Sequence, residues 1–420
     1  MIDMTLAVCV AVGFCLGVLS GLTPGLHLNN FAAMLLAVSP QLMEQGLTPF
    51  QMSSIILAAS ISQTFFDAIP AIFLGAPDSE TALSVLPGQR LMLEGRGIEA
   101  VRLSALGSAG SVVMGLFLIY PLSLIITSYY DYLTKYLGVL LLAIALMMIR
   151  SERGPWIEGQ GSLVHWKYKT IAALLFLTSG FLGIFAFNHE SLIASPLGLE
   201  PQVLLPLLSG IFGASSLILS LSDDTQIPEQ EESSIKIPGA MLARSIFSGS
   251  LGGSVVAWIP GVSPSVAAIT ARLGAPSSPE EFLVSISGVN TANALFSLVA
   301  LYSIDKPRSG AAAAIQQLME LDQTAMARMM IIVVVVAAAS YIATIGTAHQ
   351  AARAICALSY RRLCLGVLAF LVAMTYAFTG VFGLFIFFLS TVVGLIAPVA
   401  GIHRTHAMGV LMLPLIVHYL

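Results

Sequence analysis

The chain has 420 residues, of which 57% are hydrophobic and only 10% are charged, and its formal net charge is −4. A soluble domain carries about 25% charged residues, so this composition excludes a water-soluble globular protein. The sequence has no basic tract, which excludes a nucleic-acid-binding protein, and its longest polar stretches are only as long as linkers. Soluble catalytic chemistry is therefore not expected.

Apolar runs long enough to cross a bilayer recur along the whole chain. Clear examples cover residues 4–22, 52–69, 101–128, 133–149, 171–187, 204–221, 329–345 and 363–378. The runs are continuous and do not alternate with polar residues, which predicts helices and not the strands of a membrane barrel. We expect an all-α polytopic membrane protein with about 10–12 spanning or re-entrant segments.

Two parts of the chain carry the same motifs in the same order. The first motif is a Gly-xxx-Gly pair followed at one constant offset by Pro-Gly, with Gly13, Gly17, Pro24 and Gly25 in one part and Gly249, Gly253, Pro260 and Gly261 in the other. The second is a polar residue fourteen positions before a proline, with Gln63 and Pro77 matched by Asn293 and Pro307. We therefore predict two repeats, residues 1–221 and 241–420, joined by a cytoplasmic linker at 222–240.

Basic residues predict how the two repeats are oriented in the membrane. In the first repeat they flank the connections near 90–102 and 150–169, which places these connections in the cytoplasm. The turn between them, 129–136, is nearly uncharged, whereas the equivalent turn of the second repeat, 349–362, is basic. The charge pattern flips, which predicts inverted-topology repeats in the cell membrane with the N-terminus outside.

Each Pro-Gly motif is expected to interrupt a membrane helix. Irregular backbone at membrane depth is stable only when it is buried in protein or lines a watery cavity. Each break precedes a new helix start, whose free N–H groups and positive dipole end point back toward the break. Two such ends, one from each repeat, would converge near the midplane and favour an anion such as a carboxylate or a phosphate.

The residues around the two breaks are the candidate substrate site, because polar side chains inside a membrane are functional candidates. Beside the breaks these residues are Thr23, Pro24, Gly25, His27, Asn29, Asn30, Pro260, Gly261, Ser263 and Ser265, and on the segments that follow they are Gln63, Asn290 and Asn293. For the asparagines and serines beside the breaks, helix capping is the alternative interpretation. For His27 the alternative is a structural hydrogen bond.

Asp67 is the one acidic residue inside a predicted span of the repeat region. We predict that it is the coupling residue, which holds a sodium ion or a proton, and the alternative is a structural pair with a basic residue such as Arg90. The polar motifs at 189–190 and 403–406 do not fall on the repeat. We interpret each as an ordinary interfacial cluster, and the sequence predicts no metal site and no cofactor.

At these motifs the chain resembles the large membrane subunit, the TctA-like permease, of the tripartite tricarboxylate transporters, especially the shorter archaeal-type members. The stretches that carry the resemblance are 21–30, 73–80, 86–90, 94–97 and 259–263. The resemblance implies a secondary carrier of organic anions that is driven by an ion gradient and works with a small membrane subunit and an extracytoplasmic binding protein. At 288–293, Gly-Val-Asn-Thr-Ala-Asn stands where the family has an acidic, asparagine-rich motif.

The sequence thus favours a secondary active transporter of di- or tricarboxylate-like anions that works by alternating access, with a homo-oligomer left open. A polyprenyl-phosphate translocase, which the Pro-Gly segments resemble more distantly, is the first alternative and predicts an opening to lipid beside them. A passive anion channel predicts a continuous pore. An intramembrane enzyme would need His27 and Asp67, or the histidines near 403, within hydrogen-bond reach of each other.

Overall fold

The computed structural model describes residues 4–23, 28–75, 85–152, 162–196, 203–222, 228–231, 235, 237–258, 278–356 and 360–420. Within these ranges the protein consists of helices and short connections and has no strand. Seven of the described helical segments are long and apolar enough to cross a membrane, and shorter apolar helices cover Leu137–Ser151 and Leu204–Leu219. The protein is therefore an all-α, multi-pass membrane protein, as the sequence predicts.

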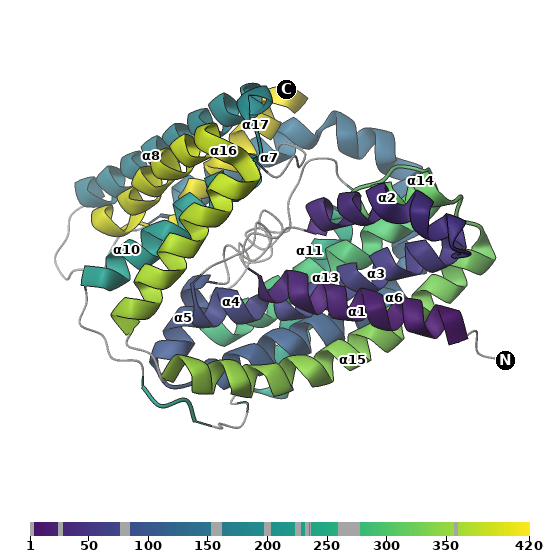
Figure 1. Ribbon diagram of the computed structural model, residues 1–420. Helices are drawn as coiled ribbons and strands as arrows, with labels where there is room; N and C mark the ends of the chain where they lie inside the picture. The colour runs from purple at the N-terminus through teal and green to yellow at the C-terminus, as the bar shows by residue number, and fades with distance from the viewer. Residues whose placement is uncertain are drawn as a thin grey trace.

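A first bundle is built around two central helices, α3 and α13 (Figure 1). Its described helices are α1 (Met4–Leu22), α2 (Leu28–Glu44), α3 (Pro49–Phe66), α4 (Ala68–Phe73), α5 (Val85–Leu93), α6 (Gly97–Lys135), α11 (Gly239–Val256), α13 (Pro279–Ile304), α14 (Gly310–Leu318) and α15 (Gln323–Cys356). The α3–α4 span is buried along its whole length and α13 along most of its length, whereas α1, α6 and α15 expose more than half of theirs. The outer helices therefore face lipid and shield α3 and α13 from it.

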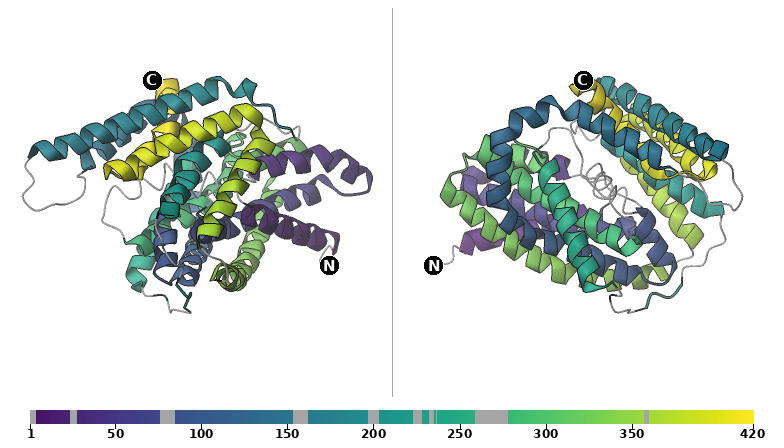
Figure 2. Two further views of the ribbon diagram at one scale, coloured as in Figure 1. Left: turned by 60° about the vertical axis from the view of Figure 1, so that its left-hand side comes forward. Right: turned by 180° about the vertical axis from the view of Figure 1, so that it is seen from behind.

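A second bundle lies beside the first (Figure 2). Its described elements are α7 (Leu137–Ser151), α8 (Ser162–Asn188), η2 (Glu190–Leu192), α9 (Leu204–Leu208), the π-helical turn η3 (Ser209–Ala214), α10 (Ser215–Ser222), α16 (Tyr360–Ala400), η4 (Arg404–Met408) and α17 (Gly409–Tyr419). Close helix packing depends on glycine here, since a Cβ at Gly183 would lie 2.0 Å from the Val410 carbonyl oxygen. Gly380, with φ of +66°, allows the sharp kink within α16.

The two bundles do not coincide with the two predicted repeats. The first repeat supplies α1–α6 to the first bundle and α7–α10 to the second, and the second repeat supplies α11 and α13–α15 to the first bundle and α16–α17 to the second. The stretch 129–136 is not the turn that the sequence predicts. Helix α6 continues to Lys135, and only Tyr136 separates it from α7. The two predicted repeats are thus interwoven, and among the described helices the chain passes from one bundle to the other after α6, α10 and α15.

The matched glycines of the two repeats have the same packing role. On α1, a Cβ at Gly13 would lie 2.4 Å from the Ile55 carbonyl oxygen of α3. On α11, a Cβ at Gly249 would lie 2.4 Å from the Ser285 carbonyl oxygen of α13. Gly17 and Gly253 repeat this one turn later, because small residues let membrane helices approach closely. The pair α1–α3 therefore packs as α11–α13 does, and the duplication itself stays a prediction.

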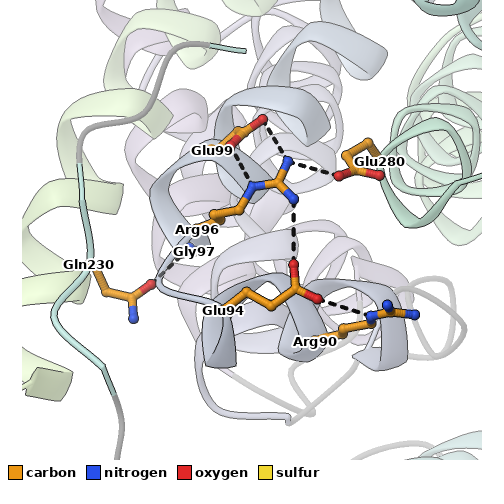
Figure 3. A network of polar contacts seen from close by, with 7 residues as sticks. All are labelled: Arg90, Glu94, Arg96, Gly97, Glu99, Gln230 and Glu280. Carbon is orange, nitrogen blue, oxygen red and sulfur yellow. Dashed lines mark hydrogen bonds and ion pairs between the residues drawn. The ribbon is translucent and has the colours of Figure 1, made fainter. Parts of the chain in front are cut away.

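A charged network ties the first repeat to the second at one end of the first bundle (Figure 3). Arg96 bonds to both carboxylate oxygens of Glu99, at 2.9 and 3.0 Å, and to Glu280 of α13 at 2.8 Å. The hydrogen bonds that Arg96 donates to the Glu99 carboxylate, which is fully buried, raise the pKa of Arg96 above its ordinary value. Arg90 is exposed and pairs with Glu94 at 3.1 Å, so it is not the structural partner of Asp67 that the sequence left open.

The predicted linker is held against this network. The Gln230 side chain accepts a hydrogen bond from the Gly97 N–H at 2.8 Å, and its amide donates to the Met92 carbonyl oxygen at 2.9 Å. The Glu231 N–H donates to the Gly95 carbonyl oxygen at 3.0 Å. The described part of the linker therefore lies on the same face of the membrane as the basic residues near 90–102, which is where the charge pattern predicts both to be.

Candidate functional site

Asp67 lies at a break in the most deeply buried span of the protein. It is 4% exposed and separates α3 from α4, and its N–H donates to the Gln63 carbonyl oxygen at 3.0 Å. Pro70 has no N–H, so the Phe66 carbonyl loses the helical hydrogen bond that another residue would supply. An acidic side chain is therefore placed where the helix is already interrupted and the surroundings exclude lipid.

The second repeat supplies the partner of this carboxylate. Asn290 of α13, 1% exposed, donates from Nδ2 to Oδ2 of Asp67 at 2.7 Å. One residue further along, the Thr291 hydroxyl donates to the Thr64 hydroxyl at 3.0 Å, and both are buried. The structure thus brings together Asp67 and Asn290, two of the residues that the sequence singles out, where α3 crosses α13.

Serines of α6 extend this polar crossing, and they were not among the predicted residues. Ser104 shares a hydrogen bond with Ser287 of α13 at 2.8 Å, and Ser108 reaches the Ser287 carbonyl oxygen at 3.3 Å. Ser111 accepts from Ser250 of α11 at 3.0 Å. The serines at 104, 108 and 111 have the i, i+4, i+7 spacing of one helix face, and this spacing is the signal that sequence reasoning missed.

The first predicted break begins directly beside Asp67. Helix α1 ends at Leu22, and the hydroxyl of Thr23 donates back to the Leu19 carbonyl oxygen at 2.7 Å. A Cβ at Gly21 would lie 3.0 Å from the Gln63 carbonyl oxygen and 3.1 Å from the Asp67 nitrogen. The end of α1, with Thr23, therefore lies against the stretch of α3 that carries Gln63 and Asp67, both of them buried.

The second predicted break begins in the same setting on α13. Helix α11 ends at Val256, and Trp258, which follows it, is fully buried. In the described part of the chain, the indole Nε1 of Trp258 has no hydrogen-bond acceptor. Asn293, half-buried, lies one turn beyond Asn290 on α13. Each break therefore starts beside the central helix of its own repeat.

Several predicted site residues lie outside the described residues, namely Pro24, Gly25, His27, Pro260, Gly261, Ser263 and Ser265. Asn29 and Asn30 belong to the first turn of α2, but their side chains are not described. The roles of all these residues stay predictions. The described geometry covers Thr23, Gln63, Asp67, Asn290 and Asn293.

The groups at the crossing favour a small cation or a proton. The atoms at the crossing that could bind a cation are carboxylate, amide and hydroxyl oxygens, which hard cations prefer. Among the described residues, Oδ1 of Asn290 accepts no hydrogen bond although it is buried, so an acceptor is available beside the carboxylate. No group of three histidine, cysteine, aspartate or glutamate side chains is placed to hold a metal ion in the described ranges.

The motif at 403–406 lies in the second bundle. His406 is bonded through Nε2 to Glu152 at 2.8 Å, and both side chains are buried, so this part of the motif is not the interfacial cluster that the sequence suggested. Asp67 belongs to the first bundle and has Asn290 as a partner. The pairing of His27 with Asp67 that an intramembrane enzyme would need stays a prediction, because His27 lies outside the described residues.

Comparison with known proteins gives one family. The model of the tripartite tricarboxylate transporter TctA family matches residues 7–409. The chain is also similar to an uncharacterized protein of Methanocaldococcus jannaschii, with 28% identity over 327 residues that cover 73% of this chain and 71% of the other. No solved structure matches the chain.

Proposed function

The chain belongs to the tripartite tricarboxylate transporter TctA family, and from this premise we propose that it is a secondary active transporter of di- or tricarboxylate-like organic anions. Family membership makes the protein a transporter subunit, and its apolar helices make it a multi-pass membrane protein. The coupling mechanism, the substrate site and the orientation with the N-terminus outside belong to the proposal. The polar crossing of α3 and α13 supports the coupling mechanism and the substrate site, and the distribution of basic residues supports the orientation.

The single observation that carries the proposal is the Asp67–Asn290 hydrogen bond, 2.7 Å long, in the core of the first bundle. An ionisable group deep in a membrane protein is costly and is retained where it has a function. This one joins a helix of each repeat beside the start of each predicted break. Ion binding at this crossing would therefore alter the conformation of both breaks together, and coupling requires such a link between the ion site and the substrate site.

The anion is proposed to bind between the two breaks. The helix starts that follow them would supply N–H groups and positive dipole ends. Thr23 lies directly before Pro24 and Trp258 lies two residues before Pro260, and the buried indole N–H of Trp258 supplies a donor of the kind that an oxyanion accepts. Gln63 and Asn293 occupy matched positions of the two repeats, and we propose that their amides orient the substrate.

The coupling ion is proposed to bind at Asp67. Sodium would use the carboxylate together with the amide oxygen of Asn290, and a proton would neutralise the carboxylate directly. In both cases the negative charge of Asp67 is compensated before the anionic substrate binds nearby. Asp67→Asn replaces the carboxylate with an amide and so removes the negative charge that sodium or a proton would neutralise. The same variant therefore tests both forms of coupling.

Alternating access is proposed to arise from rocking of one bundle against the other. Among the described helices the chain crosses between the bundles after α6, α10 and α15, and each predicted repeat contributes to both bundles. Family membership also supports partners of a tripartite system, a small membrane subunit and an extracytoplasmic binding protein. A binding protein would deliver substrate to the outer opening.

Transport of radiolabelled citrate and succinate into proteoliposomes tests the proposal, with imposed sodium or proton gradients. The wild type is compared with Asp67→Asn and with the control Asp305→Asn. Asp305 is exposed and has a positive φ of 51°, which asparagine tolerates well, so the control removes one acidic charge without strain. We expect gradient-driven uptake in the wild type and in the control. We expect Asp67→Asn to lose it.

The two gradients identify the coupling ion. A sodium gradient drives uptake only if sodium is the coupling ion, and a proton gradient drives it only if the proton is. Uptake by Asp67→Asn at the rate of the control would remove Asp67 from the coupling. Failure of folded wild-type protein to take up any soluble acid, alone and together with its accessory subunits, would contradict the organic-anion carrier. A labelled polyprenyl phosphate in the same vesicles would then test the lipid-phosphate alternative.

A further inference from the structure

The turn η4 in the second bundle is fixed by a buried carboxylate. Oε2 of Glu152, at the end of α7, accepts hydrogen bonds from the His403 backbone N–H at 3.0 Å and from the His406 ring at 2.8 Å. Glu152 and His406 are almost completely buried. The charge of Glu152 is thus met by the two histidines of the motif, and the backbone of η4 is held in one position.

Arg404, between these two histidines, points away from Glu152 toward α10. Its Nη1 donates to the Ser216 hydroxyl at 2.5 Å and to the Ser215 hydroxyl at 3.3 Å. Both hydroxyls donate in turn to carbonyl oxygens of the π-helical turn η3, those of Ile211 and Phe212. The partners of the guanidinium are therefore neutral, and they are held in place by a π-helix, an element that is frequent at functional sites.

No acidic group compensates Arg404 within the part of the chain that the structure describes. No carboxylate oxygen there lies within 4.0 Å of its nitrogens. Burial lowers the pKa of Arg404 to about 10, and no acidic neighbour raises it again. The side chain is still protonated at neutral pH. A half-buried cation with only neutral partners is costly, and an anionic ligand would remove that cost.

The geometry of the guanidinium indicates which anion would fit. Both of its protein hydrogen bonds use Nη1, and among the described residues neither Nε nor Nη2 donates to the protein. These two groups form the planar fork that binds two oxygens of a phosphate or a carboxylate. A single fork on a rigid turn is a suitable contact for a tetrahedral phosphate group.

The residues around Arg404 indicate that the site lies at the membrane boundary. Arg150 is two residues before Glu152 on α7, and α8, which packs against η4, carries Lys167, Lys169 and Trp166 near its start. Phe176 of α8 contacts Gly409 next to η4, which places Lys169 roughly 10 Å away along the helix axis. Trp166 is 68% exposed, and the Lys169 ammonium lies 5.8 Å from its ring centre. Exposed tryptophan and lysine near a helix end are typical of the lipid headgroup region.

We propose that Arg404, supported by Ser215 and Ser216 and by the cations of α7 and α8, binds a phosphate oxyanion at the membrane boundary of the second bundle. The ligand chemistry is shared by an anionic phospholipid headgroup and by free phosphate. The site is in a different bundle from the Asp67–Asn290 crossing, so it does not depend on the proposed transport function. Phospholipid bound here would hold η4 and α10 at a fixed depth in the membrane.

Native mass spectrometry of the purified full-length protein tests the proposal. Phosphatidylglycerol, phosphatidylcholine and inorganic phosphate are titrated separately into the wild type, Arg404→Gln and Arg362→Gln. Arg362 is an exposed arginine at the start of α16 and is the matched control for loss of one positive charge. We expect Arg404→Gln to weaken phosphatidylglycerol binding about tenfold or more, and Arg362→Gln to leave it unchanged.

The titrations distinguish the two sources of phosphate. Binding of inorganic phosphate that depends on Arg404, without such dependence for phosphatidylglycerol, would support the site and identify a soluble ligand. Equal binding of both phosphate ligands by wild type and Arg404→Gln would overturn the proposal. If Arg404→Gln does not fold, phenylglyoxal modification of the wild type replaces it. Phosphatidylglycerol or phosphate must then protect Arg404 from modification, and absence of protection by either would overturn the proposal.

Discussion

The amide of Asn290 is the described donor that stabilises the buried carboxylate of Asp67 from the second repeat. Asn290→Ala removes this donor and leaves the carboxylate in the same apolar surroundings. Because an incompletely paired buried charge costs more than the net gain of an ordinary hydrogen bond, we expect a loss of about 1–3 kcal/mol in the free energy of unfolding. Chemical or thermal unfolding of the purified protein in detergent measures this loss.

Asn293→Ala is the matched control, because Asn293 lies one turn away on the same helix and is only half-buried. We expect this variant to change stability by less than about 0.5 kcal/mol and to affect substrate uptake instead. Equal stability of the two variants would contradict the role of Asn290 as the stabilising partner. In that case the 2.7 Å contact would contribute nothing measurable.

The sequence identifies part of the polar residues of the crossing, without the serines of α6, and it does not show how they pair. Gln63, Asp67 and Asn290 could be selected because a polar group inside an apolar run needs a partner or a function. Their pairing depends on the depth and rotation at which α3 crosses α13, which a single sequence does not encode locally. The exposed Arg90 illustrates this limit. It was a candidate partner of Asp67 because its charge is opposite, but in the structure it pairs with Glu94.

Glycines decide how closely α1 approaches α3 and α11 approaches α13. A Cβ at Gly17 would lie 2.3 Å from the Ala59 carbonyl oxygen, and one at Gly253 would lie 2.3 Å from the Val289 carbonyl oxygen. These oxygens belong to helix backbone and cannot move independently. We expect Gly17→Ala and Gly253→Ala each to destabilise the protein by about 1–3 kcal/mol, measured by unfolding in detergent.

Gly346→Ala on α15 is the matched control, because nothing lies within 4 Å of the position that its Cβ would occupy. Alanine favours a helix over glycine by about 1 kcal/mol, so this variant should be neutral or slightly more stable. If Gly17→Ala and Gly253→Ala behaved like Gly346→Ala, the close approach of these helix pairs would be wrong. A loss in only one of the two would contradict their equivalence in the repeats.

Helix boundaries set by proline and glycine are predictable from sequence, whereas the length of α6 is not. Helix α1 ends at Leu22, directly before Thr23-Pro24, as expected from the missing N–H of proline. The nearly uncharged stretch 129–136 looked like a turn because it interrupts the apolar run. It is helical to Lys135, and Tyr129 and Tyr132 are exposed on it, as is typical of tyrosines at a membrane boundary.

At the scale of the whole molecule, the interweaving of the repeats is what sequence analysis could not provide. The matched glycines predict the repeat, but each half of the chain divides between two bundles. Which helices share a bundle is decided by contacts between distant segments, such as the packing of α6 on α13 and of α8 on α17. Among the described helices the chain changes bundle after α6, α10 and α15, so relative motion of the bundles requires backbone changes at these places.

The two ends of the first bundle are predicted to lie on opposite sides of the membrane. Helix α6 has 39 residues, which is about 58 Å, and it runs from the Arg96 network at one end to Tyr130 near the other. Helix α13 is paired with it along the same direction, since Glu280 bonds to Arg96 and Arg308, beyond the end of α13, bonds to Tyr130. The basic residues near 90–102 place the first end in the cytoplasm.

Cysteine labelling measures this orientation. In a chain whose four native cysteines are replaced by alanine, Glu94→Cys marks the end with Arg96, and Lys306→Cys marks the end with Tyr130. Both positions are exposed. A maleimide that cannot cross the membrane should label Lys306→Cys in intact cells and label Glu94→Cys only after permeabilisation. The reverse pattern would invert the whole molecule and place its N-terminus in the cytoplasm, while labelling of both positions in intact cells would mean that α6 and α13 do not span the membrane as a pair.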